Sequence, residues 1–229
     1  MPHFYDRHRK LLISTNYKVM FSRLVDEPQL QQIDAAALPA MHRQANDWQV
    51  IVRSPYARLE SFFKDKFRLN IKARRNGQAP WQHCQQLFFP VLDLDNPLDK
   101  RSIQQRFLQT SYAQFIDFLP DCYQQDVHLQ PQSYLLDEIN TVLSSDGCTR
   151  GLEGGVKDYR LIHLESAAET TAFARLSGIN MSRRANSTQH LSLDDEPVAE
   201  DVLGVIHRLY QNDFTMLGYG MRGLDGSDI

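Results

Sequence analysis

The stretch Ile51-Val-Arg53-Ser-Pro55-Tyr-Ala-Arg58-Leu-Glu-Ser61-Phe-Phe63 joins a predicted strand to a predicted helix. The apolar run that ends at Val52 is typical of a buried strand in a parallel sheet. Ser54 is a favourable N-cap residue and Pro55 suits the first helical position, so a helix should begin there. Arg53 would therefore lie at the carboxyl end of a strand, where open α/β sheets bind their ligands.

The same turn has the chemistry of an anion-binding site. The helix N-terminus offers free N–H groups and a partial positive charge. Arg53 can bind a phosphate through two hydrogen bonds, and the hydroxyl of Ser61 can donate a further one. Arg58 and Ser61 are three residues apart and should share one face of the helix. The turn therefore predicts a site for a phosphate-like group.

Length and composition limit the class of protein. The chain has 229 residues, of which 42% are hydrophobic, and this suits a single α/β domain over residues 1–229, or such a domain with a small helical addition. The net charge of -3 gives no overall attraction for polyanions, so nucleic acid is not an expected partner. No signal peptide or membrane-spanning stretch is visible, which favours a cytoplasmic location. The three cysteines are Cys84, Cys122 and Cys148. Because they lack CxxC spacing, they predict neither a zinc site nor a disulfide framework.

The hydrophobic pattern predicts a parallel sheet flanked by helices. Buried strands are expected at Leu11–Ser14, Trp48–Val52 and Tyr159–Glu165. Helices are expected over residues 27–47 with an interruption at Pro39, from 55 to about 67, and over 102–119, 167–176 and 201–217. Residues 70–100 are expected to be irregular, and residues 135–143 to form a short strand and a turn. No GxxxxGK[ST] pattern occurs, so the chain has no true Walker A motif.

The quoted stretch resembles the 3′-phosphate-binding motif of sulfotransferase family 2, the group that includes the chondroitin 4-O-sulfotransferases. That motif reads Val-Arg-Asp/Glu-Pro-aromatic-x-Arg-Leu-x-Ser-x-aromatic, and the chain matches it from Val52 to Phe63 with Ser54 in place of the acid. The resemblance implies that Arg53 and Ser61 bind the 3′-phosphate of the family's donor, 3′-phosphoadenosine 5′-phosphosulfate (PAPS).

The loop after the first predicted strand resembles the family's 5′-phosphosulfate loop, Pro-Lys-x-x-small-Ser/Thr-Ser/Thr. Lys18 falls on the motif lysine, Ser22 on the first hydroxyl position and Arg23 on the second. The loop departs from the motif at three residues. Tyr17 replaces the proline, and Met20 and Phe21 stand where the family usually has small residues that let the backbone approach the phosphate. The charge chemistry of Lys18 and Ser22 is retained.

Later segments extend the resemblance over roughly residues 10–220. They are Asp126-Val-His128-Leu-Gln-Pro131-Gln132, Leu161-Ile-His-Leu-Glu165, Asn186-Ser-Thr-Gln-His190 and Leu209 to Tyr219. The resemblance implies a P-loop-NTPase-like sulfotransferase fold. It further implies transfer of a sulfuryl group to a hydroxyl of a carbohydrate or glycolipid, by either a soluble bacterial relative or a trimmed domain. Positive side chains do the electrostatic work in such a reaction, so no metal is expected.

The catalytic roles follow from the chemistry of transfer. Charge builds on the oxygen of the leaving 5′-phosphate, and Lys18 is the expected group to stabilise it. The acceptor hydroxyl needs a base, and histidine has the appropriate chemistry. His128 is the first candidate because it matches the family's His-x-x-Pro-Gln segment. His42 is the second, since some related enzymes place a base histidine between the two phosphate motifs, and Glu165 is the third.

Two alternatives remain open at this point. A kinase-like nucleotide enzyme would require ATP with Mg²⁺, and the missing Walker lysine and serine argue against it. A non-catalytic relative of the same fold that binds a nucleotide or a glycan is compatible with the bulky residues near Lys18.

Overall fold

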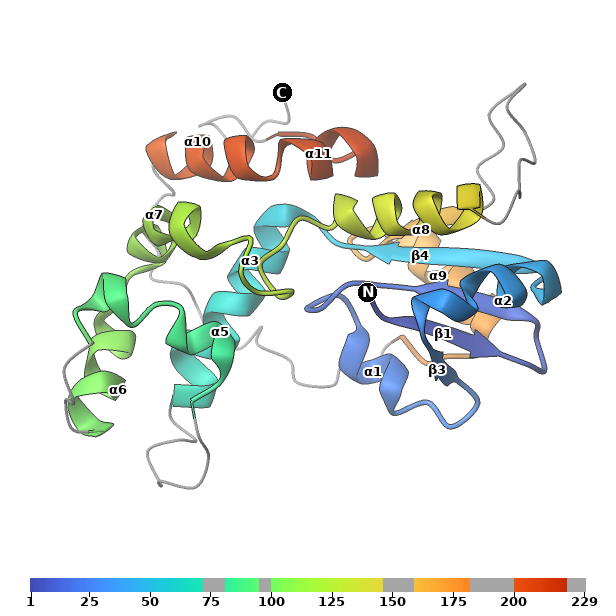
Figure 1. The fold of residues 1–229 in the computed structure, drawn as a ribbon, viewed down its shortest axis with the longest axis horizontal. Coiled ribbons are helices and arrows are strands. Elements are labelled where there is room, and N and C mark those ends of the chain that lie inside the picture. The colour runs from blue at the N-terminus through green and yellow to red at the C-terminus, as the bar shows by residue number, and fades with distance from the viewer. Residues whose placement is uncertain (72–80, 95–99, 146–158, 182–199, 222–229) are drawn as a thin grey trace. The chain divides into compact units, whose positions relative to one another are not determined.

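The computed structural model describes residues 1–71, 81–94, 100–145, 159–181 and 200–221 (Figure 1). The chain divides into two compact units. Unit 1 comprises residues 1–54 and 132–186, and unit 2 comprises residues 55–131 and 187–229. The single sulfotransferase-like domain over residues 1–229 stays a prediction, and each unit is described by itself below.

Unit 1 is built on a five-stranded sheet with the order β3-β1-β2-β4-β5. The strands are β1 (His3–Asp6), β2 (Leu11–Ser14), β3 (Gln31–Ile33), β4 (Asp47–Val52) and β5 (Arg160–His163). β2, β4 and β5 are parallel to one another, which confirms the three predicted strands and the α/β class. The sheet is nevertheless mixed, because β1 pairs antiparallel with both β2 and β3.

The β1–β2 hairpin explains why the polar N-terminal segment forms a strand that the sequence did not reveal. The buried carboxylate of Asp6 accepts hydrogen bonds from the backbone N–H groups of His8 (2.9 Å) and Arg9 (3.0 Å), and it also pairs with the Arg9 guanidinium at 3.0 Å. Burial opposes the charge of Asp6, but these bonds outweigh it and lower the pKa of the carboxyl. The turn is therefore fixed by one charged side chain rather than by a hydrophobic pattern.

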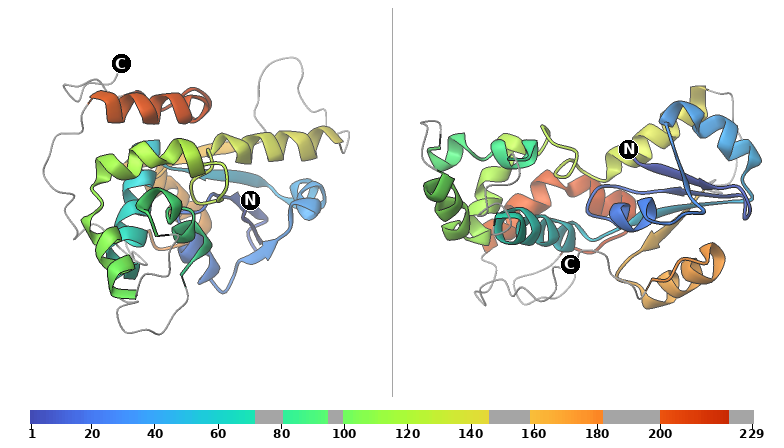
Figure 2. Two further views of the ribbon diagram at one scale, coloured as in Figure 1. Left: turned by 60° about the vertical axis from the view of Figure 1, so that its left-hand side comes forward. Right: turned by 90° about the horizontal axis from the view of Figure 1, so that it is seen from below.

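Helices cover both faces of this sheet. α2 (Leu38–Gln44) and α8 (Ser133–Ser145) lie on one face, and α9 (Ala167–Ser177) lies on the other (Figure 2). The predicted strand at residues 135–143 is wrong, since this segment lies inside α8. The predicted helix over residues 27–47 is partly wrong, because β3 and a 3-10 helix (Ala35–Ala37) precede α2, and Pro39 lies in the first turn of α2. The short helix α1 (Phe21–Val25) follows the loop after β2.

A buried polar cluster lies under α8 at the sheet. His3 is fully buried, its Nδ1 lies 2.7 Å from Oγ of Ser14, and the same oxygen accepts a hydrogen bond from Nε1 of Trp48 at 2.9 Å. Burial, reinforced by the charge of the N-terminal amino group, lowers the pKa of His3 to about 3. The folded protein therefore keeps this imidazole neutral at pH values where the unfolded chain would protonate it.

The free energy of unfolding should decrease as the pH falls below the ordinary histidine pKa of about 6.5. Between that value and about pH 3 the unfolded state binds a proton that the folded state does not, so stability rises with pH in this window. A fall to about pH 5 should cost on the order of 2 kcal/mol. Denaturant unfolding at several pH values measures this effect, with His3→Asn as the control. Identical pH slopes for the two proteins would contradict the assignment to His3.

Unit 2 is helical around an aromatic core. Its elements are α3 (Pro55–Phe63), a π-helical turn (Lys64–Leu69), α5 (His83–Gln86), a 3-10 helix (Pro90–Leu92), α6 (Lys100–Gln109), α7 (Tyr112–Cys122), α10 (Glu200–Leu209) and α11 (Gln211–Leu217). The helix predicted from Pro55 to about Phe67 is confirmed. The predicted helix over residues 102–119 is split, because Ser111 caps α7 by accepting a hydrogen bond from the Gln114 N–H.

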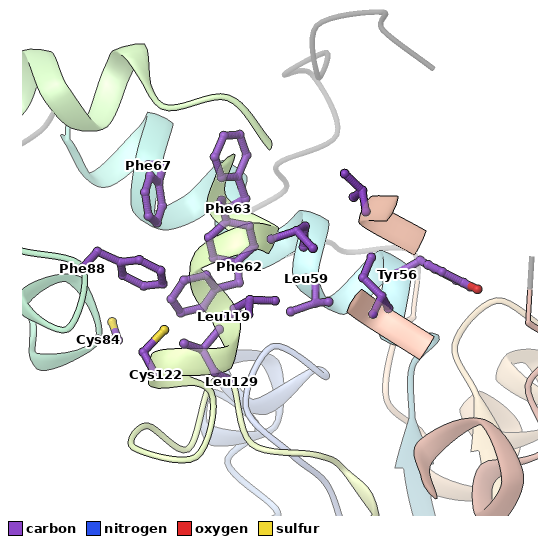
Figure 3. Packing of buried hydrophobic residues seen from close by; sticks show 14 of the residues in the cluster. Tyr56, Leu59, Phe62, Phe63, Phe67, Cys84, Phe88, Leu119, Cys122 and Leu129 are labelled. Atoms are coloured by element: carbon purple, nitrogen blue, oxygen red, sulfur yellow. The ribbon is translucent and has the colours of Figure 1, made fainter. Parts of the chain in front are cut away.

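The core of unit 2 contains several phenylalanine rings that stack or meet at an angle, together with aliphatic side chains (Figure 3). Phe62, Phe67 and Phe115 are all buried, with ring centroids 5.7 Å apart for the first and last and 5.3 Å apart for the last two. Such pairs stabilise a core beyond the burial of their area. Across the part of the chain that the structure describes, every helix is too short or too polar to cross a bilayer.

Candidate functional site

The turn that follows β4 in unit 1 is held by two side chains from distant parts of the sequence. Gln132 is buried, and its Oε1 accepts a hydrogen bond from the Arg53 N–H (3.1 Å) while its Nε2 donates to the Arg53 carbonyl (2.6 Å). Oε1 of Glu165 accepts a hydrogen bond from the Ser54 N–H at 3.0 Å. The main chain at residues 53–54 is therefore fixed before any ligand binds.

The structure brings Arg53 and the Lys18 loop together. Nη1 of Arg53 lies 3.4 Å from the carbonyl oxygen of Lys18, at hydrogen-bond distance. β2 and β4 are adjacent parallel strands, so the loops that leave their carboxyl ends meet at one edge of the sheet. The main chain of the Lys18 loop and the Arg53 side chain, which follow two adjacent parallel strands, therefore lie together at the end of the sheet where open α/β sheets bind their ligands.

The Lys18 loop has an unusual backbone. Lys18 has φ 65° and Met20 has φ 59°, both in the left-handed region that residues other than glycine rarely adopt. The loop is tied by Thr15, whose hydroxyl donates to the Val19 carbonyl, and by Asn16, whose Oδ1 accepts from the Tyr17 N–H at 2.9 Å. Strain of this kind, about 1–3 kcal/mol for each residue, is typical of functional loops.

The bulky residues of this loop pack against other side chains of unit 1. The Phe21 ring lies 4.9 Å from the Tyr17 ring and 6.2 Å from the Phe4 ring, and Met20 and Phe21 border the apolar cluster around Ile13. These residues replace the small ones of the resembled motif, and part of their surface is buried in packing.

The two further donor-binding candidates lie in α1. Ser22 is exposed in the first turn of this five-residue helix. Arg23 is only 14% exposed and forms an ion pair with Glu27, four residues further along. The guanidinium of Arg23 therefore shares its charge with Glu27, whereas Ser22 presents its hydroxyl to solvent.

The candidate base His42 lies in the last turn of α2. Its ring centroid is 5.3 Å from that of Trp48, at the amino end of β4. Arg53 follows the carboxyl end of the same six-residue strand, and a strand rises about 3.3 Å per residue. His42 therefore lies near the amino end of β4, whereas Arg53 and the Lys18 loop lie at the carboxyl end of this strand.

In unit 2, Ser61 is half-buried on α3, and Arg58 is turned into the interior. Nη2 of Arg58 donates a hydrogen bond to the His128 carbonyl at 3.0 Å and lies 3.5 Å from the Val127 carbonyl oxygen. Tyr210, which is also buried, donates its hydroxyl hydrogen to the Leu129 carbonyl at 2.6 Å. Arg58 therefore supports the chain around His128, a role that its spacing from Ser61 did not reveal.

The candidate base His128 is oriented by a carboxylate. Nδ1 of His128 lies 2.6 Å from Oδ1 of Asp126, and the same oxygen accepts a hydrogen bond from the His128 N–H at 2.8 Å. Burial disfavours the charged carboxylate, but the hydrogen bonds from His128 and one from His83 outweigh it and lower the pKa of Asp126 to about 2. An ionised carboxylate accepts hydrogen bonds only, so the Nδ1 atom of His128 donates to it, and Nε2 is the ring nitrogen that is left for other partners.

Comparison with known proteins gives one result. The model of the sulfotransferase family matches residues 13–220. Searches of curated proteins and of solved structures found no match. The matched range contains the Lys18 loop, the turn at Arg53 and the segment around His128.

Proposed function

The chain belongs to the sulfotransferase family, and from this premise we propose that it transfers a sulfuryl group from PAPS to a hydroxyl of a carbohydrate or glycoconjugate. The observation that carries the proposal is the pairing of Arg53 with the Lys18 loop at one edge of the sheet. PAPS carries anionic groups at two separated positions, and two cationic residues on adjacent βα connections suit such a molecule.

The donor roles follow from this arrangement. Arg53 binds the 3′-phosphate, and the Ser61 hydroxyl contributes a further hydrogen bond. Lys18 binds the 5′-phosphosulfate with Ser22, and Arg23 adds positive charge nearby. The clamp of Gln132 on the Arg53 backbone supports this role because a fixed main chain leaves less motion to be lost when the donor binds.

The transfer step needs little covalent participation from the protein. The sulfuryl group moves in line from the 5′-phosphate oxygen to the acceptor oxygen through a loose transition state, as in phosphoryl transfer. Lys18 stabilises the charge that develops on the leaving oxygen. The acceptor hydroxyl gives its proton to Nε2 of His128, and Asp126 holds the ring in the required tautomer.

The other two base candidates are kept as alternatives for the experiments. Glu165 binds the Ser54 N–H, which supports a role in shaping the turn rather than in proton transfer. His42 contacts Trp48 at the far end of β4. The direct test of the function is transfer of labelled sulfur from PAPS to a panel of glycans, glycolipids and small alcohols. Failure to transfer, combined with binding of ATP and Mg²⁺, would favour a kinase-like enzyme.

Replacing Arg53 with alanine should weaken binding of adenosine 3′,5′-bisphosphate by about 2–3 kcal/mol, the loss of a charge-assisted contact. Adenosine 5′-phosphate, which lacks the 3′ group, should bind almost as well as before. Calorimetry with both ligands measures the difference, and Arg43→Ala removes an exposed arginine of unit 1 as the matched control. Equal losses for both nucleotides would show that Arg53 does not bind the 3′-phosphate.

A further inference from the structure

Unit 2 contains a compact group of side chains that the transfer reaction does not fully use. Cys84, Asp126 and His128 each offer one possible ligand atom, and these atoms all lie within 4.8 Å of one another. Cys84 comes from α5, whereas Asp126 and His128 follow α7. Cys84 and Asp126 are buried, and His128 is half-buried. Folding thus brings together three metal-binding side chains from segments about forty residues apart.

The donor set determines which metal would fit. A thiolate, an imidazole and a carboxylate suit Zn²⁺, whereas Mg²⁺ and Ca²⁺ prefer oxygen ligands alone. Zinc binds these atoms at about 2.0–2.3 Å in a tetrahedron, which places neighbouring ligand atoms roughly 3.5 Å apart. Because the ligand atoms lie within 4.8 Å of one another, the longest separation needs a contraction of at most about 1.3 Å, which side-chain rotations can supply.

We propose that Cys84, Asp126 and His128 form a binding site for Zn²⁺. The thiolate and the carboxylate together balance the two charges of the ion, so the complex adds no net charge to the interior of unit 2. His83 is a candidate for the fourth position, since its Nδ1 lies 3.3 Å from Oδ2 of Asp126 and its side chain is 67% exposed. Binding releases the proton of the Cys84 thiol to solvent.

Occupancy of this site has a consequence for the reaction. A histidine that ligates zinc cannot accept a proton from an acceptor hydroxyl, because the ion takes the lone pair that the proton needs. Zn²⁺ should therefore inhibit transfer reversibly through His128. This consequence rests on the proposed function, whereas the binding of zinc does not.

Equilibrium dialysis of the full-length chain against Zn²⁺ should give one bound ion per molecule, with Mg²⁺ as the negative control. Cys84→Ser should lower the affinity by about 100-fold or more, since even groups that only support a ligand contribute about 10–100-fold. Cys122→Ser is the matched control, because Cys122 is also a buried cysteine of this core but lies outside the three-residue cluster (Figure 3). Asp126→Asn is a second test in case Cys84→Ser folds poorly.

Cobalt gives an independent readout. Co²⁺ bound at this site should show a thiolate-to-cobalt charge-transfer absorption that Cys84→Ser lacks and Cys122→Ser keeps. Equal zinc affinity in Cys84→Ser and the parent would overturn the site, whether or not the protein transfers sulfate. The ratio of transfer rates with and without Zn²⁺ should fall in the parent and stay near one in Cys84→Ser at the same free zinc concentration. Stoichiometric binding with no loss of transfer would overturn the block at His128.

Discussion

His128→Ala should lower the rate of sulfuryl transfer by about 10²–10⁴-fold, the usual contribution of a positioned general base. The affinity for adenosine 3′,5′-bisphosphate should stay unchanged, because in the proposed site other residues bind the donor. The physical reason is the hydrogen bond between Asp126 and Nδ1, which fixes the ring and leaves Nε2 as the nitrogen that can face the acceptor hydroxyl in the proposed reaction. Turnover at saturating donor and a separate binding titration measure the two effects.

The controls for this prediction distinguish the three base candidates. Asp126→Asn should reduce transfer less than His128→Ala, since it weakens the hydrogen bond that orients the His128 imidazole but does not remove the imidazole. His42→Ala should be close to the parent. Near-normal transfer in His128→Ala with loss of transfer in His42→Ala would move the base to His42. If neither change matters, Glu165 becomes the candidate, and the resemblance around residues 126–132 is structural.

Lys18→Ala should lower turnover by about 10²–10³-fold, as expected for the loss of one group that stabilises a developing oxyanion. Its effect on donor affinity should be smaller, because the contact strengthens as charge reaches the leaving oxygen. Measuring both turnover and the donor dissociation constant separates the two contributions.

Lys10→Ala provides the matched control for Lys18. Lys10 is an exposed lysine that immediately precedes β2, whereas Lys18 lies in the loop beyond the other end of that strand. Its removal should leave both turnover and donor affinity unchanged. A Lys18→Ala protein with normal turnover and weak donor binding would limit Lys18 to recognition of the bound donor.

The parallel part of the sheet was predictable because its strands are continuous apolar runs. Leu11–Ser14 and Trp48–Val52 are buried on both faces, and such runs are distinctive. β1 was not predicted because a single buried carboxylate, that of Asp6, fixes its turn. β3 was not predicted because its glutamines are polar. α8 was mistaken for a strand because the short apolar run within residues 135–143 fits both periods.

Only part of the candidate site could be inferred from the sequence. Lys18 and Arg53 each lie in a local motif next to a strand, so their meeting follows from the parallel pairing of β2 and β4. The clamp by Gln132 and the pairing of Asp126 with His83 depend on folded contacts across tens of residues, which local patterns do not encode. The same holds for Cys84, since the absence of CxxC spacing concealed ligands that come from two separate segments.

The left-handed backbone at Lys18 limits how the protein can be made more heat-resistant. Glycine is the residue that such a conformation favours, so substitution there would relieve strain but would remove the amine on which the proposed chemistry depends. Lys10 has the same kind of backbone, with φ 50°, and no proposed role in transfer. We therefore expect Lys10→Gly to raise thermal stability without loss of transfer activity, whereas Lys18→Gly should gain stability at the expense of activity.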